Sequence, residues 1–352
     1  MEIKIGGKTI GAGRPAFIVA ELSANHGGSF NIAARTLKAI KAAGADAVKV
    51  QTYTPDTITL DCASPAFKIQ HGTLWDGVTL YDLYKKAYMP WAWQPKLRKL
   101  AEKLGLIFFS TPFDFTAVDF LEKMKVPAYK IASFEITDIP LIKYTASKGK
   151  PMILATGVAR LRDIEDAVSA CRRAGNRRLV LLKCTSAYPA PYEDINLSVM
   201  ADMARRFGVI TGLSDHTPGI AVPIAAAALG AAVIEKHFIL DRKLGGPDAA
   251  FSLEPAEFKA MTDGIRAAEK AVGRITYELS PKAAKNRKFM RSLFVVEDVK
   301  KGEALTAKNI RSIRPGDGMA PKYFHEVLGR TAARALKRGM PLKNTMIGGR
   351  KK

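Results

Sequence analysis

Cysteine is scarce in this sequence. The 352 residues include three cysteines, Cys62, Cys171 and Cys184, which stand far apart and without the close spacing of metal ligands. This set excludes a disulfide scaffold and is typical of a reducing compartment, where each thiol serves as a small buried side chain. Residues 1–13 also lack the apolar core of a signal peptide. We therefore expect a cytoplasmic protein.

Long uncharged stretches are almost missing as well. Residues 217–234 carry no charge and reach the threshold of about 18 residues that is usual for a membrane span. This stretch is rich in Ala and Gly, however, and it contains two prolines between polar flanks of catalytic character. We interpret it as a packed helix that leads into a buried strand, and we expect no membrane span.

Acidic residues are in short supply. The chain has 33 Asp and Glu against 55 Lys and Arg, a net charge of +22. Residues 282–352 contain 19 Lys and Arg but 5 Asp and Glu, a net of +14, and the rest of the chain carries +8. Such a basic tail indicates an anionic substrate, nucleic acid, an acidic lipid surface or simply a solvated face. Because it has no zinc ligands and no aromatic pair on a strand, we expect no nucleic-acid partner.

The chain is instead rich in short apolar runs, and 47% of its residues are hydrophobic, which excludes a disordered protein. Expected strands are residues 17–21, 47–51, 106–110, 128–133, 152–156, 179–184, 209–214 and 232–238, with helical patterns such as 33–43, 94–104, 117–124, 161–174 and 256–272 between them. Eight strand–helix units in about 270 residues predict an α/β fold, the (β/α)8 TIM barrel. A doubly wound sheet is the alternative, but residues 23–28 lack the glycine spacing of a phosphate loop.

The domain organisation follows from the same pattern. We predict a catalytic barrel over residues 1–279, a polar linker over 280–288 and a small domain of short strands and Gly/Pro turns over 289–352. About sixty residues is small for independent stability. We therefore expect the small domain to pack on a barrel, either its own or a partner's.

Three lysines lie in predicted strands whose C-terminal ends would form the active site of a barrel. They are Lys49, Lys130 and Lys183. Because a buried charge costs several kcal/mol unless it is paired, three converging cations imply an anion that the ligand supplies. The hydroxyls that would complete a phosphate or carboxylate cage belong to Thr111, Ser133 and Ser214.

Two of the five histidines, His216 and His237, end neighbouring predicted strands, which lie about 5 Å apart in a sheet. Two such imidazoles can share a divalent ion, with Glu21 and Asp248 as oxygen donors. Mixed nitrogen and oxygen ligands favour Mn²⁺, with Mg²⁺, Co²⁺ and Zn²⁺ as alternatives. Weaker candidates are His26 and His71, and no role is expected for His325. A carboxylate is also needed to handle protons, and Glu135 or Asp248 fits that task or that of a helix cap.

At these residues the sequence resembles the sialic acid synthase family of phosphoenolpyruvate-dependent nonulosonate synthases, and most closely its pseudaminic acid branch. The matching segments are residues 18–26, 48–53, 109–114, 129–135, 183–189, 212–217, 235–238 and 246–248. The resemblance extends over nearly the whole chain, and its last part is similar to an antifreeze-like (SAF) domain. It implies an enzyme that condenses phosphoenolpyruvate with a six-carbon amino-sugar aldehyde to give a nine-carbon 2-keto acid and phosphate.

The resemblance also implies roles for individual residues. The implied metal ligands are His216 and His237, and the implied phosphoenolpyruvate-binding residues are Lys49, Thr111, Lys130, Ser133 and Ser214. The implied catalytic residues are Glu21, Glu135, Tyr188 and Asp248, and the implied sugar-binding residues are Asn25, Gln51, Ser186, Tyr188 and Arg314. Arg314 matches an arginine that the SAF domain reaches into the partner's barrel, which implies a domain-swapped homodimer. The implied chemistry is attack by C3 of phosphoenolpyruvate on a metal-polarised aldehyde, water addition at C2 managed by Glu135, and loss of phosphate by C–O cleavage.

Three positions depart from the family pattern: Gly27, Ala155 and Ala249. Residues 22–24 and 83–91, together with Ser186, favour 2,4-diacetamido-2,4,6-trideoxy-L-altrose as the sugar. Alternatives are N-acetylmannosamine and the legionaminic acid precursor, because one methyl or hydroxyl shifts selectivity by only a few kcal/mol.

Two other classes of protein stay open at this stage. The first is a non-catalytic barrel whose basic tail holds an anionic polymer, with steep salt dependence and no need for a metal. The second is a pyruvate aldolase with Lys183 as the Schiff-base lysine. The intact set of Glu21, Lys130, His216 and His237 argues against the first.

Overall fold

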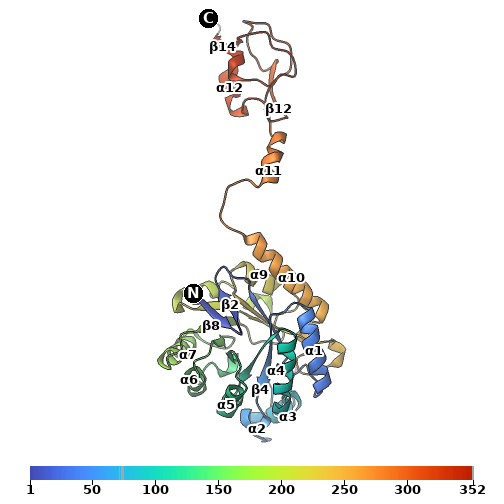
Figure 1. Ribbon diagram of the computed structural model, residues 1–352, viewed down its shortest axis with the longest axis vertical. Coiled ribbons are helices and arrows are strands. Elements are labelled where there is room, and N and C mark those ends of the chain that lie inside the picture. Colours follow the sequence, from blue (N-terminus) through green and yellow to red (C-terminus); the bar gives the residue numbers. More distant parts are fainter. Residues whose placement is uncertain (71, 73–74, 351–352) are drawn as a thin grey trace. The chain divides into compact units, whose positions relative to one another are not determined.

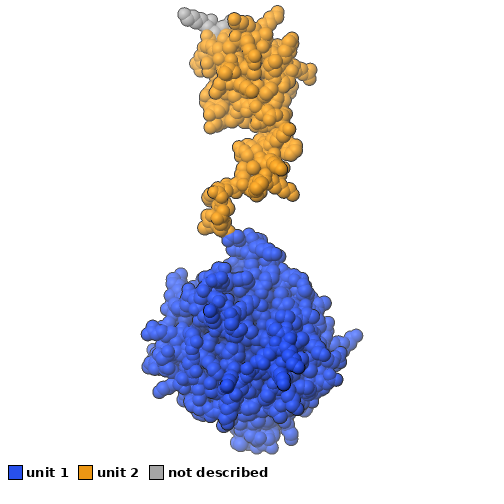
Figure 2. Space-filling model, viewed as in Figure 1, with its two compact units in different colours: residues 1–273 blue, residues 274–352 orange. Residues whose placement is uncertain are grey.

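The computed structural model of the protein describes residues 1–70, 72 and 75–350, so the weak candidate His71 lies outside the described residues. The chain forms two compact units, Met1–Gly273 and Arg274–Lys352 (Figures 1 and 2). The boundary follows the end of helix α10 (Pro255–Val272). The segment expected as a linker contains α11 (Pro281–Asn286), which begins where the Ser280 hydroxyl accepts a bond from the Ala283 N–H, and the short η7 (Arg287–Phe289).

Unit 1 is built around a closed barrel of eight parallel strands, and β10 closes the barrel by pairing with β3. The strands in barrel order are β3 (Phe17–Glu21), β4 (Ala47–Thr52), β5 (Ile107–Pro112), β6 (Tyr129–Ile131), β7 (Met152–Ala155), β8 (Leu179–Cys184), β9 (Ile210–Asp215) and β10 (Val233–His237). The predicted (β/α)8 barrel is confirmed, and each expected strand is present.

Helices surround the strands on the outside of the barrel (Figure 1). They are α1 (Phe30–Ala42), α4 (Gln94–Lys103), α5 (Phe115–Lys123), α6 (Ile139–Ser147), α7 (Leu161–Arg173), α8 (Val199–Phe207), α9 (Ala221–Ala228) and α10. The uncharged stretch 217–234 supplies α9 and the start of β10, as the sequence predicts. No helix of the described chain is long and apolar enough to span a bilayer.

An antiparallel hairpin that the sequence analysis did not predict precedes the barrel. It consists of β1 (Glu2–Ile5) and β2 (Lys8–Gly11), joined at two glycines, Gly6 and Gly7, that both have positive φ. Its buried isoleucines pack in one apolar cluster with residues that begin the barrel strands, namely Ile3, Ile5 and Ile10 with Phe17, Phe109, Val180 and Val233. The hairpin therefore closes the N-terminal end of the barrel, and polar chemistry is confined to the C-terminal end.

Short helices lie in the loops that follow the strands. They are α2 (Pro55–Ile58), η1 (Pro65–Phe67), α3 (Leu80–Ala87), η2 (Trp91–Trp93), η3 (Ser133–Glu135), η4 (Tyr192–Asp194), η5 (Arg242–Leu244) and η6 (Ala249–Phe251). Most of the loop chain follows β4, where α2, η1 and α3 precede α4.

Unit 2 has a small core of its own, which includes Leu293, Val295, Ile310, Leu336 and Leu342. Two antiparallel pairs surround it, β11 (Ser292–Val295) with β12 (Ile310–Ile313) and β13 (Arg330–Ala332) with β14 (Ile347–Arg350). Shorter elements are η8 (Pro321–Tyr323), α12 (Phe324–Val327) and η9 (Asn344–Met346).

Candidate functional site

Charged side chains alternate in sign across the C-terminal half of the barrel interior. Lys49 Nζ is 2.7 Å from Glu21 Oε2 and 3.5 Å from Glu235 Oε1, and Lys130 Nζ is 3.0 Å from the same Glu235 oxygen. Each of these side chains is at most 5% exposed. The Ser214 hydroxyl donates to Glu235 Oε1 at 3.1 Å. Four strands thus contribute to one buried network, which we call the interior ion network (Glu21, Lys49, Lys130 and Glu235).

The interior ion network corrects the expectation that unpaired lysines require an anion from the ligand. Two carboxylates already balance Lys49 and Lys130, because Glu235 was overlooked as a partner. Lys183 is not part of the convergence: it is half-buried and donates to the Cys184 carbonyl at 2.7 Å and the Thr185 hydroxyl at 3.1 Å. Two lysines, not three, therefore meet inside the barrel.

Burial and charge act in opposite directions on the pKa values in this network. For Glu235, burial opposes ionisation, but Lys130 and Lys49 outweigh it and lower the pKa to about 2. For Glu21, burial dominates over Lys49 and raises the pKa. For Lys130, burial lowers the pKa despite Glu235. Glu235 accordingly stays ionised at neutral pH.

A cradle of small polar groups lies beside the network. The Ser133 hydroxyl accepts from the Gly157 N–H at 3.1 Å. A Cβ at Gly157 would lie 2.1 Å from Ser186 Oγ, 2.7 Å from Ser133 Oγ and 3.0 Å from Cys184 Sγ, so any other residue here would displace these side chains. Thr111, on β5, is fully buried, and its hydroxyl accepts from Lys49 at 3.4 Å. These donors suit the oxygens of a phosphate or carboxylate.

The two candidate metal ligands face each other at the ends of β9 and β10. The ring centroids of His216 and His237 are 5.3 Å apart. His216 Nδ1 is 3.0 Å from the Thr185 carbonyl, which can only accept, so Nδ1 carries the proton and Nε2 is left for an ion. Burial, with His216 adding to it, lowers the pKa of His237 well below its usual value, which keeps this imidazole in the neutral form that binds metals.

The hydrogen bonding of His237 indicates whether these residues fit a metal ion. His237 Nδ1 is buried, has no hydrogen-bond partner among the described residues, and lies 3.8 Å from Asp248 Oδ2. Glu21 is the register partner of His237 across β3 and β10. In the part of the chain that the structure describes, no three His, Cys, Asp or Glu side chains stand at ligand spacing. The unpartnered His237 nitrogen beside His216 fits an ion with two imidazole ligands, whose further positions would be left for water or substrate oxygens.

The candidate proton-handling group follows β6. Glu135 ends η3, and its Oε2 is buried without a hydrogen-bond partner among the residues described. Burial, reinforced by Asp138, raises the pKa of Glu135 to about 7. A carboxyl that titrates near neutral pH can both accept and return a proton.

Some of the candidate sugar-binding residues already use their polar atoms in hydrogen bonds within the protein, and others do not. Gln51 donates to Glu21 Oε1 at 3.2 Å and to the Ser23 hydroxyl at 2.9 Å. The buried Asn25 uses its amide N–H groups on the Phe238 carbonyl, at 3.0 Å, and on Ser252. Its amide therefore ties the loop after β3 to the end of β10. Arg314 directly follows β12 in unit 2 and is exposed.

Aromatic rings enclose the histidines: Tyr188 was predicted as a site residue, whereas Phe251 and Trp75 were missed by the sequence analysis. The Tyr188 ring centroid is 4.5 Å from that of His216, and the Phe251 centroid is 5.0 Å from that of His237 and 5.1 Å from that of Tyr188. Trp75 reaches the same cluster: its ring lies 5.6 Å from Tyr188, and its indole N–H donates to the Pro247 carbonyl at 3.2 Å. Strand periodicity could not reveal Trp75 or Phe251, because both lie in loops.

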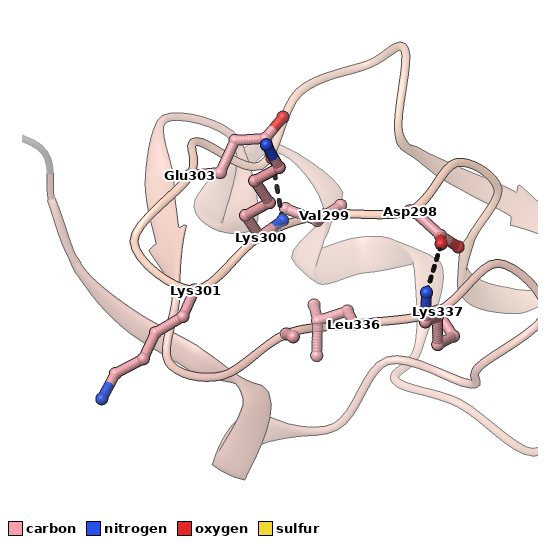
Figure 3. Close-up of a pocket in the computed structure, with 8 residues that line it drawn as sticks. Asp298, Val299, Lys300, Lys301, Glu303, Leu336 and Lys337 are labelled. Carbon is pink, nitrogen blue, oxygen red and sulfur yellow. Dashed lines mark hydrogen bonds and ion pairs between the residues drawn. The ribbon is translucent and has the colours of Figure 1, made fainter.

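A separate hollow lies on unit 2 (Figure 3). It is lined by Asp298, Val299, Lys300, Lys301, Glu303, Ala335, Leu336 and Lys337. Its two carboxylates are engaged, Asp298 with Lys337 at 2.7 Å and Glu303 with the Lys300 N–H at 2.8 Å. None of the predicted site residues lines this hollow, so the chemistry is assigned to the barrel.

Comparison with known proteins covers both units of the chain. The NeuB family pattern matches residues 36–277, and the SAF domain pattern matches residues 290–348. The pseudaminic acid synthase of Helicobacter pylori is 49% identical over 330 residues, which cover 94% of this chain and 97% of that protein. The pseudaminic acid synthase of Campylobacter jejuni is 44% identical over 332 residues, which cover 94% of this chain and 96% of that protein. Among solved structures, the N-acetylneuraminic acid synthetase of Leptospira borgpetersenii, crystallised with citrate, matches with a TM-score of 0.72 at 32% identity, over 81% of this chain and 95% of that chain.

Proposed function

The chain belongs to the NeuB family, and we propose that it is a pseudaminic acid synthase, a transferase-type enzyme that condenses phosphoenolpyruvate with 2,4-diacetamido-2,4,6-trideoxy-L-altrose. The observation that carries the proposal is 49% identity to a pseudaminic acid synthase along 94% of this chain. The products are a nine-carbon 2-keto sugar acid and inorganic phosphate.

The interior ion network and the serine cradle would bind phosphoenolpyruvate. Lys49 and Lys130 donate to its anionic oxygens, together with the hydroxyls of Thr111, Ser133 and Ser214. Because Glu21 and Glu235 already balance the two lysines, the pocket is close to neutral before the substrate arrives. This balance suits the reaction, since C2 of phosphoenolpyruvate becomes positively charged when C3 attacks the aldehyde, and preorganised carboxylates stabilise such a charge.

The reaction balances with water as the third reactant. C3 of phosphoenolpyruvate forms a bond to the aldehyde carbon, and the aldehyde oxygen takes up a proton to become a hydroxyl. Water adds to C2 and gives its proton to Glu135, whose pKa near 7 suits both halves of a proton transfer. The C2–O bond then breaks, phosphate leaves with both bonding electrons, and the C2 hydroxyl becomes the keto group as its proton is lost.

His216 and His237 would hold a divalent ion, with Mn²⁺ favoured and Mg²⁺ or Co²⁺ as alternatives. When bound, this ion supplies a Lewis acid that polarises the sugar aldehyde. The orphaned Nδ1 of His237 and the fixed tautomer of His216 support this assignment. Asp248 lies 3.8 Å from His237, and Gln51 donates to Glu21. Both side chains would therefore be near the bound sugar and would orient its hydroxyls.

The assembly is part of the same proposal. A homodimer in which the SAF unit of each chain covers the partner's barrel would bring Arg314 to an anionic substrate. The exposure of Arg314 on unit 2 is what such a role requires. The cytoplasm, which supplies phosphoenolpyruvate, is the compartment that we assign.

The N-acetylneuraminic acid synthetase of 32% identity keeps N-acetylmannosamine as a second candidate sugar. The test is phosphate release from phosphoenolpyruvate by metal-free protein, with and without Mn²⁺, against the diacetamido-trideoxy-altrose, N-acetylmannosamine and the legionaminic acid precursor in separate reactions. Release that requires Mn²⁺ and the altrose supports the proposal. Release with another sugar alone overturns the substrate, and no release with any sugar overturns the enzymatic function.

A further inference from the structure

A second pair of opposite charges is buried on the outer side of the barrel wall. Lys236 Nζ is 2.5 Å from Asp215 Oδ2, and neither side chain is exposed at all. The two residues stand directly opposite each other where β10 pairs with β9. Since side chains alternate along a strand, they point away from the interior that Ser214 and Glu235 face. The pair therefore touches no substrate.

The sequence position of this pair connects it to the two histidines. Asp215 immediately precedes His216, and Lys236 immediately precedes His237. Asp215 also accepts bonds from the Thr217 N–H at 3.1 Å and from the Thr217 hydroxyl at 3.0 Å, and Lys236 donates to the Thr217 carbonyl. Asp215 and Thr217, which flank His216, are thus both bonded to Lys236, which precedes His237.

The barrel wall does not need an ion pair here for stability. One step earlier on the same outer face, Ile234 stands opposite Leu213, and both are buried in the main apolar cluster. An apolar pair at the next step would do as well or better, because taking two charges out of water offsets much of their attraction. A charged pair adds directed bonds of fixed length, which an apolar contact lacks. Its contribution is therefore to geometry.

We propose that Asp215 and Lys236 are positioning residues that fix the spacing of His216 and His237 and so set the affinity for a divalent ion. This inference rests on the metal site of the proposed function. The ring separation of 5.3 Å depends on how far the ends of β9 and β10 stand apart. The Lys236–Asp215–Thr217 bonds link those ends on the outer face, and the Ser214–Glu235 bond links them on the inner face. Groups that hydrogen-bond metal ligands directly commonly change metal affinity 10- to 100-fold, and we expect an effect of that order where the chain beside both ligands is held by buried bonds.

The test measures Mn²⁺ binding to the full chain without substrates, by titration calorimetry and by the electron paramagnetic resonance signal of free Mn²⁺. The main variant, Asp215→Leu with Lys236→Met, removes both charges together. We expect its melting temperature to stay within a few degrees of the wild type and its Mn²⁺ dissociation constant to rise at least 10-fold. The dissociation constant of phosphoenolpyruvate, measured without metal, should change less than 3-fold.

Two further variants keep the test decisive. Asp215→Asn retains an oxygen for Thr217 and Lys236 but loses the charge. Because it leaves Lys236 buried without a counter-charge, it should be less stable than the double variant, and at temperatures where it is folded it should weaken Mn²⁺ binding. Lys150→Met is the matched control, since it breaks the Lys150–Glu122 pair of 2.8 Å, just before β7 begins, and should leave Mn²⁺ affinity unchanged. Wild-type affinity in both folded variants at Asp215 overturns the inference alone. Absence of Mn²⁺ binding in the wild type overturns the proposed metal site, and the inference with it.

Discussion

Glu235 and Lys130 form an ion pair of 3.0 Å across the inside of the barrel, although 105 positions separate them in the sequence. The same carboxylate oxygen also accepts from Ser214 and lies near Lys49. Glu235 is therefore the residue that joins three members of the proposed phosphoenolpyruvate pocket.

Replacing Glu235 with Gln should separate substrate binding from catalysis. The variant leaves Lys130 and Lys49 partly uncompensated, which should cost about 3–5 kcal/mol of stability, as breaking buried pairs does. The added positive charge should leave phosphoenolpyruvate binding as tight or tighter, while kcat falls roughly 100-fold because the positive centre at C2 loses a stabilising carboxylate. Steady-state kinetics and calorimetry on the folded variant measure both effects. Weaker phosphoenolpyruvate binding with an unchanged kcat would contradict this account of Glu235.

Glu135→Gln should remove a titration from the pH profile. With its pKa raised by burial to about 7, Glu135 changes charge within the working range, so kcat/KM of the wild type should show a limb near pH 7. The pH profile of the variant should lack this limb, and its rate should be about 10²–10⁴-fold lower.

The stability of the same variant gives an independent check on Glu135. A carboxyl whose pKa is higher in the folded state than its ordinary value of 4.5 destabilises the fold as the pH rises through the interval from 4.5 to about 7. The melting temperature of Glu135→Gln relative to the wild type should therefore improve between these pH values. A constant difference across the interval would show that Glu135 has an ordinary pKa.

The inward residues of the strands could be predicted from sequence because a period of two fixes which side chains share a face. Lys49, Lys130 and Ser214 were found from a simpler signal, since each lies in or at the end of an expected strand whose C-terminal end would form the active site of a barrel. Their pairing with Glu235 could not be predicted, since it depends on which strands lie across the barrel from one another. The hydroxyls of Ser133 and Ser186 were named, but the backbone that gathers them at Gly157 was not visible.

Gly157→Ala tests the cradle beside the network. The new Cβ would lie 2.1 Å from Ser186 Oγ and 2.7 Å from Ser133 Oγ, so both hydroxyls must move. We expect the KM for phosphoenolpyruvate to rise at least 10-fold, with a smaller change in the KM for the sugar. Gly349→Ala is the matched control, because a Cβ there meets nothing within 4 Å. Equal KM values for the two variants would exclude the cradle from the anion site.

A substitution in the hairpin at the N-terminal end of the barrel should lower stability without changing activity. Ile5 is fully buried in the cluster that it shares with Phe17 and Phe109, at the opposite end of the strands from His237 and Glu235. Ile5→Ala should therefore lower the free energy of unfolding by about 2–5 kcal/mol, through lost apolar contacts and the cavity that remains.

At temperatures where Ile5→Ala is folded, its kcat and both KM values should equal those of the wild type, because the hairpin contributes no group to the C-terminal end of the barrel. Urea unfolding and steady-state kinetics on the same preparation measure the two quantities side by side. A comparison change, Leu229→Ala, removes as many carbon atoms from a side chain of unit 1 that is 61% exposed, and it should change the unfolding energy of the barrel far less. A loss of kcat in folded Ile5→Ala would mean that the closed end of the barrel controls the geometry of the catalytic end.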